Sequence, residues 1–454
     1  MGMTVSPRLL AAVAILSMLS LIASCGGGGG GGGGGSSAGS GGGGSSAASN
    51  PYFPEGSSIP ASGPEVPGSA AIDQAAMSFM RLHNVPGMAV ALAKDGKLLL
   101  ARGYGYADFE ARQPVQPDSR FRVASVSKMV TTLAIMRLRD QGQLDLDQPF
   151  LGIINQYQVG PSGDARLRDV TLRQMLQHMG GWDRNDPKVG DIAFASDRIA
   201  QALGTPRPAS SDDLIRYVMN SPLQFTPGTQ GSYSNIGFIV LGRVIEKISG
   251  QSYESYAREQ VLAPLGIHSM AIAGSHASDR STNEARYYPF PGEATVTSDF
   301  PTEGKVPAPY AVNMARIDAA GSWVASAIDL TRLMTAYDAT LTPGFLTADS
   351  IQQMKAHPPT APTSTSWYGL GLTLGPTADT YSHSGTISGT AADLLHDDRG
   401  YVLAVILNTV DLGTSQYTLL APAAIQAAFA SGIAGSETDL YLQYPSPVVP
   451  AHGP

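Results

Sequence analysis

The arrangement of apolar and polar positions predicts two β-hairpins, one near each end of the folded part of the chain. Residues 87–108 hold two apolar runs around the turn sequence KDG, and residues 390–409 hold two more around HDDRG. Apolar runs separated by Asp- and Gly-containing turns are typical of paired antiparallel strands. We therefore predict one antiparallel sheet to which both ends of the chain contribute.

Helical spacing dominates elsewhere. Apolar residues recur every three or four positions in segments bounded by glycine and proline, which predicts amphipathic helices. The predicted fold class is α+β: a sheet built from both chain ends and flanked by helices, with an all-helical lobe inserted at about residues 114–313. The main predicted helices lie at residues 71–84, 169–179, 210–220, 235–250, 326–337 and 415–431, the last with a kink at Pro422.

The first 24 residues have the pattern of a secretory signal. A single arginine, Arg8, precedes an apolar run and then small residues before Cys25, the only cysteine in the chain. The sequence "IASC" resembles a bacterial lipobox, so we expect residues 1–24 to be removed and Cys25 to carry lipid. This predicts anchoring in the bacterial cell envelope, with the protein on the periplasmic or extracellular side of the membrane.

The composition of the remaining residues divides them into a tether, a folded domain and a C-terminal tail. Residues 25–66 are rich in Gly, Ser and Pro, which predicts a disordered tether. We assign residues 67–435 to the folded domain and residues 436–454 to a C-terminal tail. The formal net charge of −8 and the absence of basic runs argue against a nucleic-acid partner.

A serine and a lysine three residues apart carry the first chemical signal. Ser125 stands where a helix N-cap is expected, and Lys128 falls in the first turn of a helix that is apolar nearly all round. Burial and the positive helix end both lower a lysine pKa, so a neutral amine would lie beside a hydroxyl nucleophile. Taken alone, this spacing also fits an ordinary N-cap serine and a lysine that extends to solvent.

Two further motifs are candidates for the same site. Tyr233 and Asn235 precede an apolar helix; the tyrosine could relay the serine proton and the amide could bind substrate. His383, Ser384 and Gly385 open the second hairpin as substrate-binding candidates. Glycine on a strand lets substrate approach the backbone, so the N–H groups of Ser125 and Thr386 could form an oxyanion hole.

In this order, S-x-x-K, Y-x-N and H-x-G, the motifs resemble those of the serine β-lactamase and penicillin-binding-protein superfamily. The chain is most similar to its class C β-lactamases, serine D-alanyl-D-alanine carboxypeptidases and related esterases, over about residues 70–430. The resemblance implies that Ser125 is acylated, that Lys128 takes its proton, and that Tyr233 serves as base and acid. It implies neither a metal nor a cofactor, and His396–Asp398 are interpreted as turn residues.

One difference from the motifs of this superfamily bears on which substrate the site would accept. Penicillin-hydrolysing relatives usually carry Lys-Thr-Gly where this chain has His383-Ser384-Gly385, and a largely neutral histidine attracts a substrate carboxylate less strongly. A small-ester hydrolase is therefore favoured, followed by a D-alanyl peptidase and a β-lactamase, with a non-catalytic envelope binding protein as the alternative of another class. We expect His178 to fix a loop.

The size of the acyl group that the site accepts should depend on the shapes of loops 185–208 and 277–310. The sequence leaves open whether Tyr368 lines the cleft or packs in the core or at its rim.

Overall fold

The computed structural model describes residues 50–359, 366–375, 377, 379–412, 433 and 439–450. The predicted signal peptide, Cys25 and the helix predicted over residues 415–431 lie outside these ranges. Among the described residues, no helix is long and apolar enough to cross a membrane.

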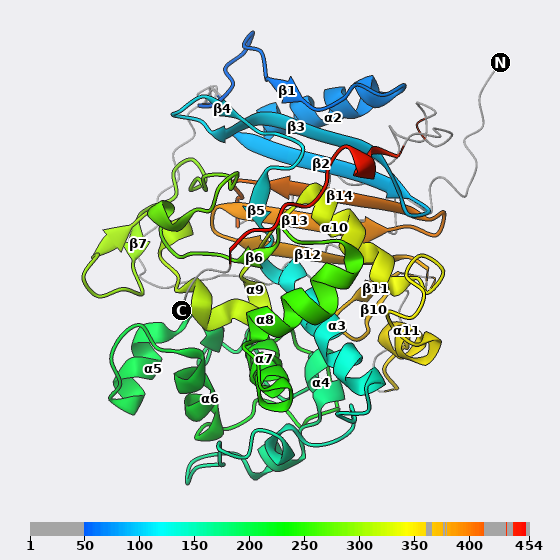
Figure 1. The fold of residues 1–454 in the computed structure, drawn as a ribbon. Helices are drawn as coiled ribbons and strands as arrows, with labels where there is room; N and C mark the ends of the chain where they lie inside the picture. Colours follow the sequence, from blue (N-terminus) through cyan, green and yellow to red (C-terminus); the bar gives the residue numbers. More distant parts are fainter. Residues whose placement is uncertain are drawn as a thin grey trace, which may run out of the picture.

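A twisted antiparallel sheet forms one half of the molecule (Figure 1). Its strands come from the two ends of the chain, because β14 pairs with β2 and so joins the N-terminal hairpin to the C-terminal one. This confirms the predicted fold class. In spatial order the strands are β1 (Ala61–Ser62), β3 (Lys97–Asp108), β2 (Gly87–Lys94), β14 (Tyr401–Leu407), β13 (Thr390–His396), β12 (Tyr381–Ile387), β11 (Thr373–Leu374) and β10 (Trp367–Tyr368), and β4 (Gln113–Pro114) also pairs with β3.

Both hairpin turns form where they were predicted. In the first, Asp95 and Gly96 have φ values of 48° and 76°, as a two-residue turn between twisted strands requires. In the second, the carboxylate of Asp397 accepts the backbone N–H groups of Arg399 and Tyr401. Asp397 is therefore a turn residue, as interpreted from the sequence.

Each face of the sheet packs on its own hydrophobic core. Side chains alternate between faces along a strand, so Ala89 and Ala91 of β2 join one core while Met88 and Val90 join the other. The second core lies beneath α2 (Ser69–Leu82), the helix predicted at residues 71–84. The first core continues into the helical half of the molecule, and the three motifs proposed from the sequence lie on that side.

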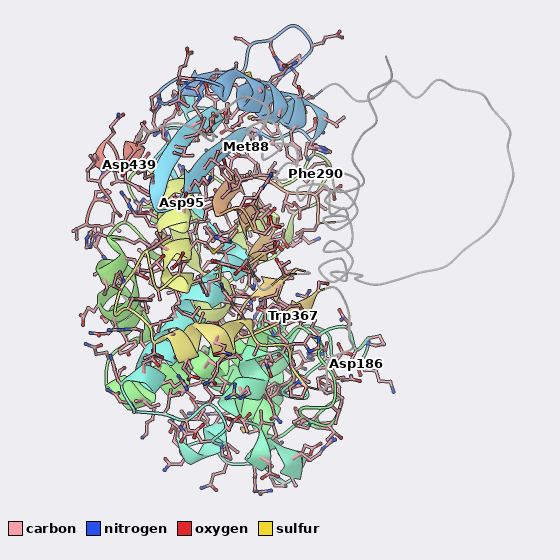
Figure 2. All side chains as sticks on the ribbon, turned by 90° about the vertical axis from the view of Figure 1, so that its right-hand side faces the viewer. Met88, Asp95, Asp186, Phe290, Trp367 and Asp439 are labelled. Atoms are coloured by element: carbon pink, nitrogen blue, oxygen red, sulfur yellow. The ribbon has the colours of Figure 1, made fainter. Side chains whose placement is uncertain are left out.

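Helices form most of the inserted lobe below the sheet in Figure 1. In Figure 2, Met88 and Asp95 mark the sheet and Asp186 marks a lobe loop. Two small sheets accompany these helices: β5 (Arg120–Arg122) and β6 (Ala271–Ile272) pair with β9 (Trp323–Ser326), which follows the insert, and β7 (Val296–Thr297) pairs with β8 (Lys305–Val306). The described helices of the insert are α3 (Ser127–Asp140), α4 (Leu172–Leu176), α5 (Ser196–Leu203), α6 (Ser211–Met219), α7 (Asn235–Ser249) and α8 (Tyr253–Ala257). After the insert follow α9 (Asp318–Gly321), α10 (Ala327–Met334), which packs on β14 and β2 of the sheet, and α11 (Ala348–Lys355).

The end of the predicted tether is ordered, which corrects the boundary placed at residue 66. Phe53 and Ile59 are buried against the second core, and β1 adds to the edge of β3. The Asn50 side chain donates to the carbonyls of Met80 and Arg81 at the end of α2. Composition predicted disorder here because Gly and Pro are abundant, but buried apolar side chains, strand pairing and the Asn50 hydrogen bonds hold the segment on the domain.

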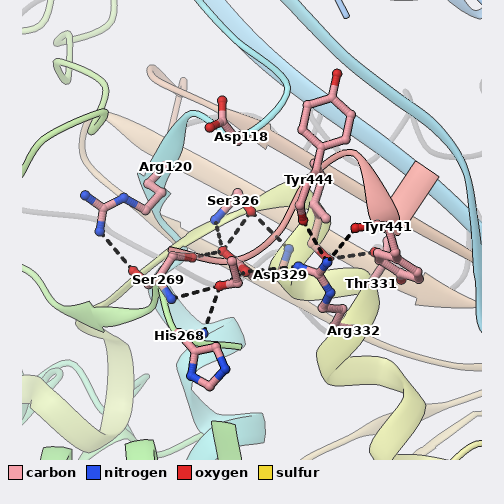
Figure 3. A network of polar contacts seen from close by, with 12 residues as sticks. Asp118, Arg120, His268, Ser269, Ser326, Asp329, Thr331, Arg332, Tyr441 and Tyr444 are labelled. Carbon is pink, nitrogen blue, oxygen red and sulfur yellow. Dashed lines mark hydrogen bonds and ion pairs between the residues drawn. The ribbon is translucent and has the colours of Figure 1, made fainter. Parts of the chain in front are cut away.

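Residues 439–450, which belong to the predicted C-terminal tail, pack on the domain (Figure 3). The Tyr441 hydroxyl donates to Thr331 Oγ1 of α10 at 2.8 Å, and Arg332 donates to the Tyr444 carbonyl at 2.8 Å. Ser446 Oγ donates to Asp329, whose other carboxylate oxygen caps α10 through Ser326. Residues 439–450 are therefore part of the folded domain.

Candidate active site

Ser125 lies in a 3-10 turn between β5 and α3 and is half-buried. It is not the helix N-cap, as the sequence had suggested: α3 begins at Ser127, and its N-cap, Val126, has no side chain that could cap. Ala124 has a φ of 44°, a strained value for a residue with a Cβ atom. The strained turn presents the Ser125 hydroxyl beside the first turn of α3.

Strand β9 holds this turn from both sides. The Val123 N–H donates to the Trp323 carbonyl at 2.9 Å, and the Trp323 N–H donates to Ser127 Oγ at 3.0 Å. Both bonds are buried, so breaking either would leave a polar group without a partner in the core. The position of Ser125 is therefore fixed by strand β9, which lies about 200 residues further along the chain.

Lys128 is fully buried, and its amine contacts three oxygen atoms. Its Nζ lies 3.1 Å from Ser125 Oγ, 2.7 Å from Asn235 Oδ1 and 2.7 Å from the Ala320 carbonyl at the end of α9. Burial lowers the pKa of Lys128 well below its usual value, and the nearby charge of Arg184 lowers it further, against an opposing effect of Asp191. The direction of this shift agrees with the neutral amine expected from the sequence.

Tyr233 borders the same amine. The Lys128 Nζ lies 4.8 Å from the centre of the tyrosine ring, and the Arg184 guanidinium lies 4.3 Å from it. Among the residues that the structure describes, Arg184 forms no ion pair. The Arg184 guanidinium therefore stands at the Tyr233 side of the site, beside the buried Lys128 amine.

The amide of Asn235, the first residue of α7, is held at both of its ends. Its Oδ1 accepts from Lys128, and its Nδ2 donates to Asp191 Oδ2 at 2.6 Å. The sequence prediction gave Asn235 a role in substrate binding. In this structure its amide contacts Lys128 and a loop carboxylate, and direct contact with substrate stays a prediction.

His383 is buried in β12 and is neutral. Its Nδ1 lies 2.7 Å from the Ser384 carbonyl, which only accepts, so Nδ1 carries the proton. Its Nε2 then accepts from the Tyr368 hydroxyl at 2.9 Å. Burial, followed by the charge of Lys128, lowers the pKa of His383 to about 3. Tyr368, which the sequence left open, therefore contacts the H-x-G motif from β10.

Gly385 lies directly against the 3-10 turn that carries Ser125. A Cβ atom at this position would come within 2.3 Å of the Val123 carbonyl oxygen and 2.7 Å of the Ser125 nitrogen. Both are backbone atoms that cannot move aside cheaply, which explains the glycine. The backbone that leads to Thr386 is thereby brought beside Ser125, as the oxyanion-hole prediction requires. The Ser384 side chain falls on the opposite face of β12 from His383 and Gly385.

His178 fixes a loop, in agreement with the sequence prediction. Its Nδ1 accepts the Ser234 N–H at 3.1 Å, its carbonyl accepts the Ser232 N–H, and its ring centre lies 4.1 Å from that of Tyr233. Burial, with smaller effects of Lys128, His383 and Arg184, lowers its pKa well below the usual value. His178 is thus a neutral residue that holds the Y-x-N loop in place.

Sequence reasoning missed three contributors to the site. Arg184 and Asp191 lie in the loop before α5, where neither stands in a recognisable motif, and the third is the backbone carbonyl of Ala320. No periodicity or motif spacing marks such residues, because only the folded loop brings them to Tyr233, Asn235 and Lys128. The sequence predicted that acyl size depends on loop 185–208 but singled out neither Asp191, which lies in this loop, nor Arg184, which directly precedes it.

The chain belongs to the Beta-lactamase family, whose model matches residues 72–426. This confirms the resemblance drawn from the three motifs, all of which lie within the matched range.

Individual relatives are more distant. The chain is 31% identical to Esterase EstB of Burkholderia gladioli over 207 residues, which are 44% of this chain and 49% of EstB. It is 26% identical to Protein flp of Staphylococcus aureus (strain N315) over 227 residues, 50% of this chain and 42% of flp. The chain thus spans about two fifths to half of the length of these curated relatives.

The fold is similar to that of the octameric penicillin-binding protein homologue from Pyrococcus abyssi. The TM-score is 0.61 at 24% identity, and the alignment covers 82% of this chain and 80% of that one.

Proposed function

We propose that the protein is a serine hydrolase that forms an acyl-enzyme on Ser125 and hydrolyses small esters. The observation that carries this proposal is the contact of 3.1 Å between Ser125 Oγ and the buried amine of Lys128. A neutral amine at this distance takes the serine proton as the hydroxyl attacks an acyl carbonyl. Similarity to Esterase EstB supports the choice of esters.

The later steps use the other residues of the site. The N–H groups of Ser125 and Thr386 stabilise the oxyanion that forms on the attacked carbonyl. Tyr233 donates a proton to the leaving group and then deprotonates the water that attacks the acyl-enzyme. Because His383 is neutral, the H-x-G strand offers no cation to a substrate carboxylate, which favours a neutral ester over a β-lactam.

The decisive experiment traps the intermediate. The full chain is incubated with p-nitrophenyl acetate, quenched in acid and digested for mass spectrometry. We expect release of p-nitrophenol and one acetyl group on the peptide that contains Ser125. A folded protein that releases no p-nitrophenol and carries no acyl group on Ser125 would contradict the proposal and favour a binding protein without catalysis.

A D-alanyl peptidase is the second candidate, and Arg184 is the observation that favours it. We propose that a substrate whose leaving group carries a carboxylate would place it near the Arg184 guanidinium, which lies over Tyr233. Arg184→Gln is then expected to lower kcat/KM for a D-alanyl-D-alanine peptide about 10- to 100-fold, since a hydrogen bond to a charged group contributes ~1.5–3 kcal/mol. Hydrolysis of p-nitrophenyl acetate at high pH should change little. Equal losses for both substrates would argue against this candidate.

We propose further that lipid on Cys25 anchors the protein in the cell envelope. The signal-like residues 1–24 and the Gly/Ser-rich residues that follow support this proposal. Cys25→Ala should move the protein from the membrane fraction to the soluble fraction of expressing bacteria, because one apolar anchor is lost. An unchanged distribution between the two fractions would contradict lipid anchoring.

A further inference from the structure

The amide of Asn235 stands between the catalytic lysine and one loop carboxylate. Asn235 Oδ1 lies 2.7 Å from Lys128 Nζ, and Asn235 Nδ2 lies 2.6 Å from Asp191 Oδ2. The other oxygen of Asp191, Oδ1, accepts the backbone N–H of Ala193 at 3.1 Å and so caps the short turn Ile192–Phe194. Asp191 is therefore held by its own loop while it contacts Asn235.

The donor and acceptor properties of these groups determine which way the Asn235 amide faces. An asparagine presents a carbonyl oxygen on one side and an NH₂ group on the other, and only the hydrogen-bond partners decide between the two orientations. An ionised carboxylate only accepts hydrogen bonds. Asp191 therefore requires the NH₂ group on its side, which leaves the carbonyl oxygen facing Lys128.

The orientation of this amide decides where the Lys128 lone pair points. A neutral amine has two N–H bonds and one lone pair. The Ala320 carbonyl, at 2.7 Å, accepts one N–H, and Asn235 Oδ1 accepts the other. The lone pair is then left for the third neighbour, the Ser125 hydroxyl. If the amide were reversed, its NH₂ group would donate to this lone pair, and Lys128 would present an N–H to Ser125 instead.

We infer that Asp191 is a positioning residue of the catalytic site: by fixing the orientation of the Asn235 amide, it directs the lone pair of Lys128 to Ser125. This inference rests on the proposed function and deepens it. Asp191 reaches Ser125 only through Asn235 and Lys128.

Other groups that face Lys128 affect its protonation and therefore the pH dependence of any variant. They come from the Y-x-N loop, from α7, from β12, from the His178 loop and from the loop before α5. The positive charge of Arg184 opposes protonation of Lys128 and the negative charge of Asp191 favours it, while His178 and His383 are neutral. The uncharged neighbours include the rings of Tyr233 and Phe238 and the amide of Asn235, together with the Ser125 hydroxyl and the Ala320 carbonyl.

Asp191→Asn provides the central test because it keeps the shape of the side chain. Its new carbonyl oxygen continues to accept the Ala193 N–H, so its NH₂ group must face Asn235. Asn235 then has to present its oxygen to residue 191 and its NH₂ group to Lys128, the reversed orientation. We expect kcat/KM for p-nitrophenyl acetate to fall about 100-fold, the lower range of what a general base contributes.

A second substitution should restore the original direction of the hydrogen bonds. In Asp191→Asn combined with Asn235→Asp, the amide donates to the new carboxylate, whose other oxygen accepts from Lys128. We expect at least about a tenfold recovery of kcat/KM relative to Asp191→Asn alone. A carboxylate beside Lys128 favours the ammonium form, so the recovery should occur at higher pH than the wild-type optimum.

Two further variants separate positioning from a structural role. Asp191→Ala leaves the Asn235 amide free to take either orientation, so its loss of activity should be smaller than that of the isosteric Asp191→Asn. A purely structural role predicts the opposite order, because alanine also removes the cap of the turn. Asp186→Asn is the matched control: this carboxylate caps its own loop at the Lys188 N–H and should leave kcat/KM unchanged.

A fluorophosphonate probe gives a readout of Ser125 reactivity that does not depend on the substrate. Slow labelling of Asp191→Asn and faster labelling of the double variant would support the inference. Labelling of Asp191→Asn at the wild-type rate, or no recovery in a folded double variant at any pH, would overturn it. A wild-type protein that neither labels nor hydrolyses the ester would contradict the proposed function itself.

Discussion

Replacing Ser125 with alanine is expected to abolish hydrolysis of p-nitrophenyl acetate, with a loss of at least ~10⁴-fold in kcat/KM. The reason is geometric. Ser125 is the hydroxyl that lies 3.1 Å from the Lys128 amine and whose N–H stands beside Gly385. Alanine removes the atom that would become acylated while leaving the backbone turn in place, so folding should be preserved. The measurement is initial-rate hydrolysis with the full chain, together with its thermal unfolding.

Ser127→Ala is the informative comparison because this serine is two residues away in the same motif. Its hydroxyl accepts the buried Trp323 N–H, so its loss should destabilise the fold by ~1–3 kcal/mol. We expect a lower Tm but an activity far above that of Ser125→Ala. A Ser125→Ala variant that kept a tenth of the wild-type activity would show that Ser125 is not the nucleophile.

Lys128→Arg is expected to lower kcat/KM at least ~10³-fold even though it keeps a positive charge. A guanidinium does not lose its proton in proteins, so it cannot accept the proton of Ser125. The contribution of general-base catalysis, typically 10²–10⁴-fold, sets the size of the effect. The wild-type pH profile should show an acid limb, because the pKa of Lys128 is lowered and protonation at low pH removes the base. Lys188→Arg, at an exposed position, is the control.

Lys128→Met is a second test of the same role, needed because arginine could be too large for the buried site and prevent folding. Methionine fills a similar volume without a charge, and it removes an amine whose burial is costly. We therefore expect a Tm equal to or above that of the wild type together with the same loss of activity, which is typical of catalytic groups that a fold holds at the expense of stability. Activity of either variant within tenfold of wild type would contradict the assigned role of Lys128.

The local patterns of the sequence were sufficient to predict the two hairpins and several of the helices. Apolar runs around KDG and HDDRG predicted both hairpins, and three-to-four spacing predicted α2, α7 and α10, because each of these signals depends on neighbouring residues. The ordered segment at residues 50–66 could not be predicted in this way. Its stability comes from burial of Phe53 and Ile59 against distant strands, and its composition resembles that of a linker.

The residue types of the candidate site, and the order of their motifs along the chain, were likewise predicted from the sequence. Ser125, Lys128, Tyr233, Asn235 and His383 stand in motifs whose spacing is readable without a structure. Only the tertiary structure decided how each of them is used. It put Ser125 in a strained turn rather than at an N-cap, kept the buried His383 neutral with its proton on the nitrogen that faces the Ser384 carbonyl, and bound the Asn235 amide to Asp191.

The physical reason for this division lies in the range of the interactions. Helix and strand periodicity, turns and motif spacing arise within a few residues of one another, so the sequence displays them directly. Proton positions and pKa values depend on burial and on partners that other elements bring in, such as Asp191, Arg184 and the Ala320 carbonyl. The sequence thus determined which groups could react, and the folded chain decided which of them carries the proton.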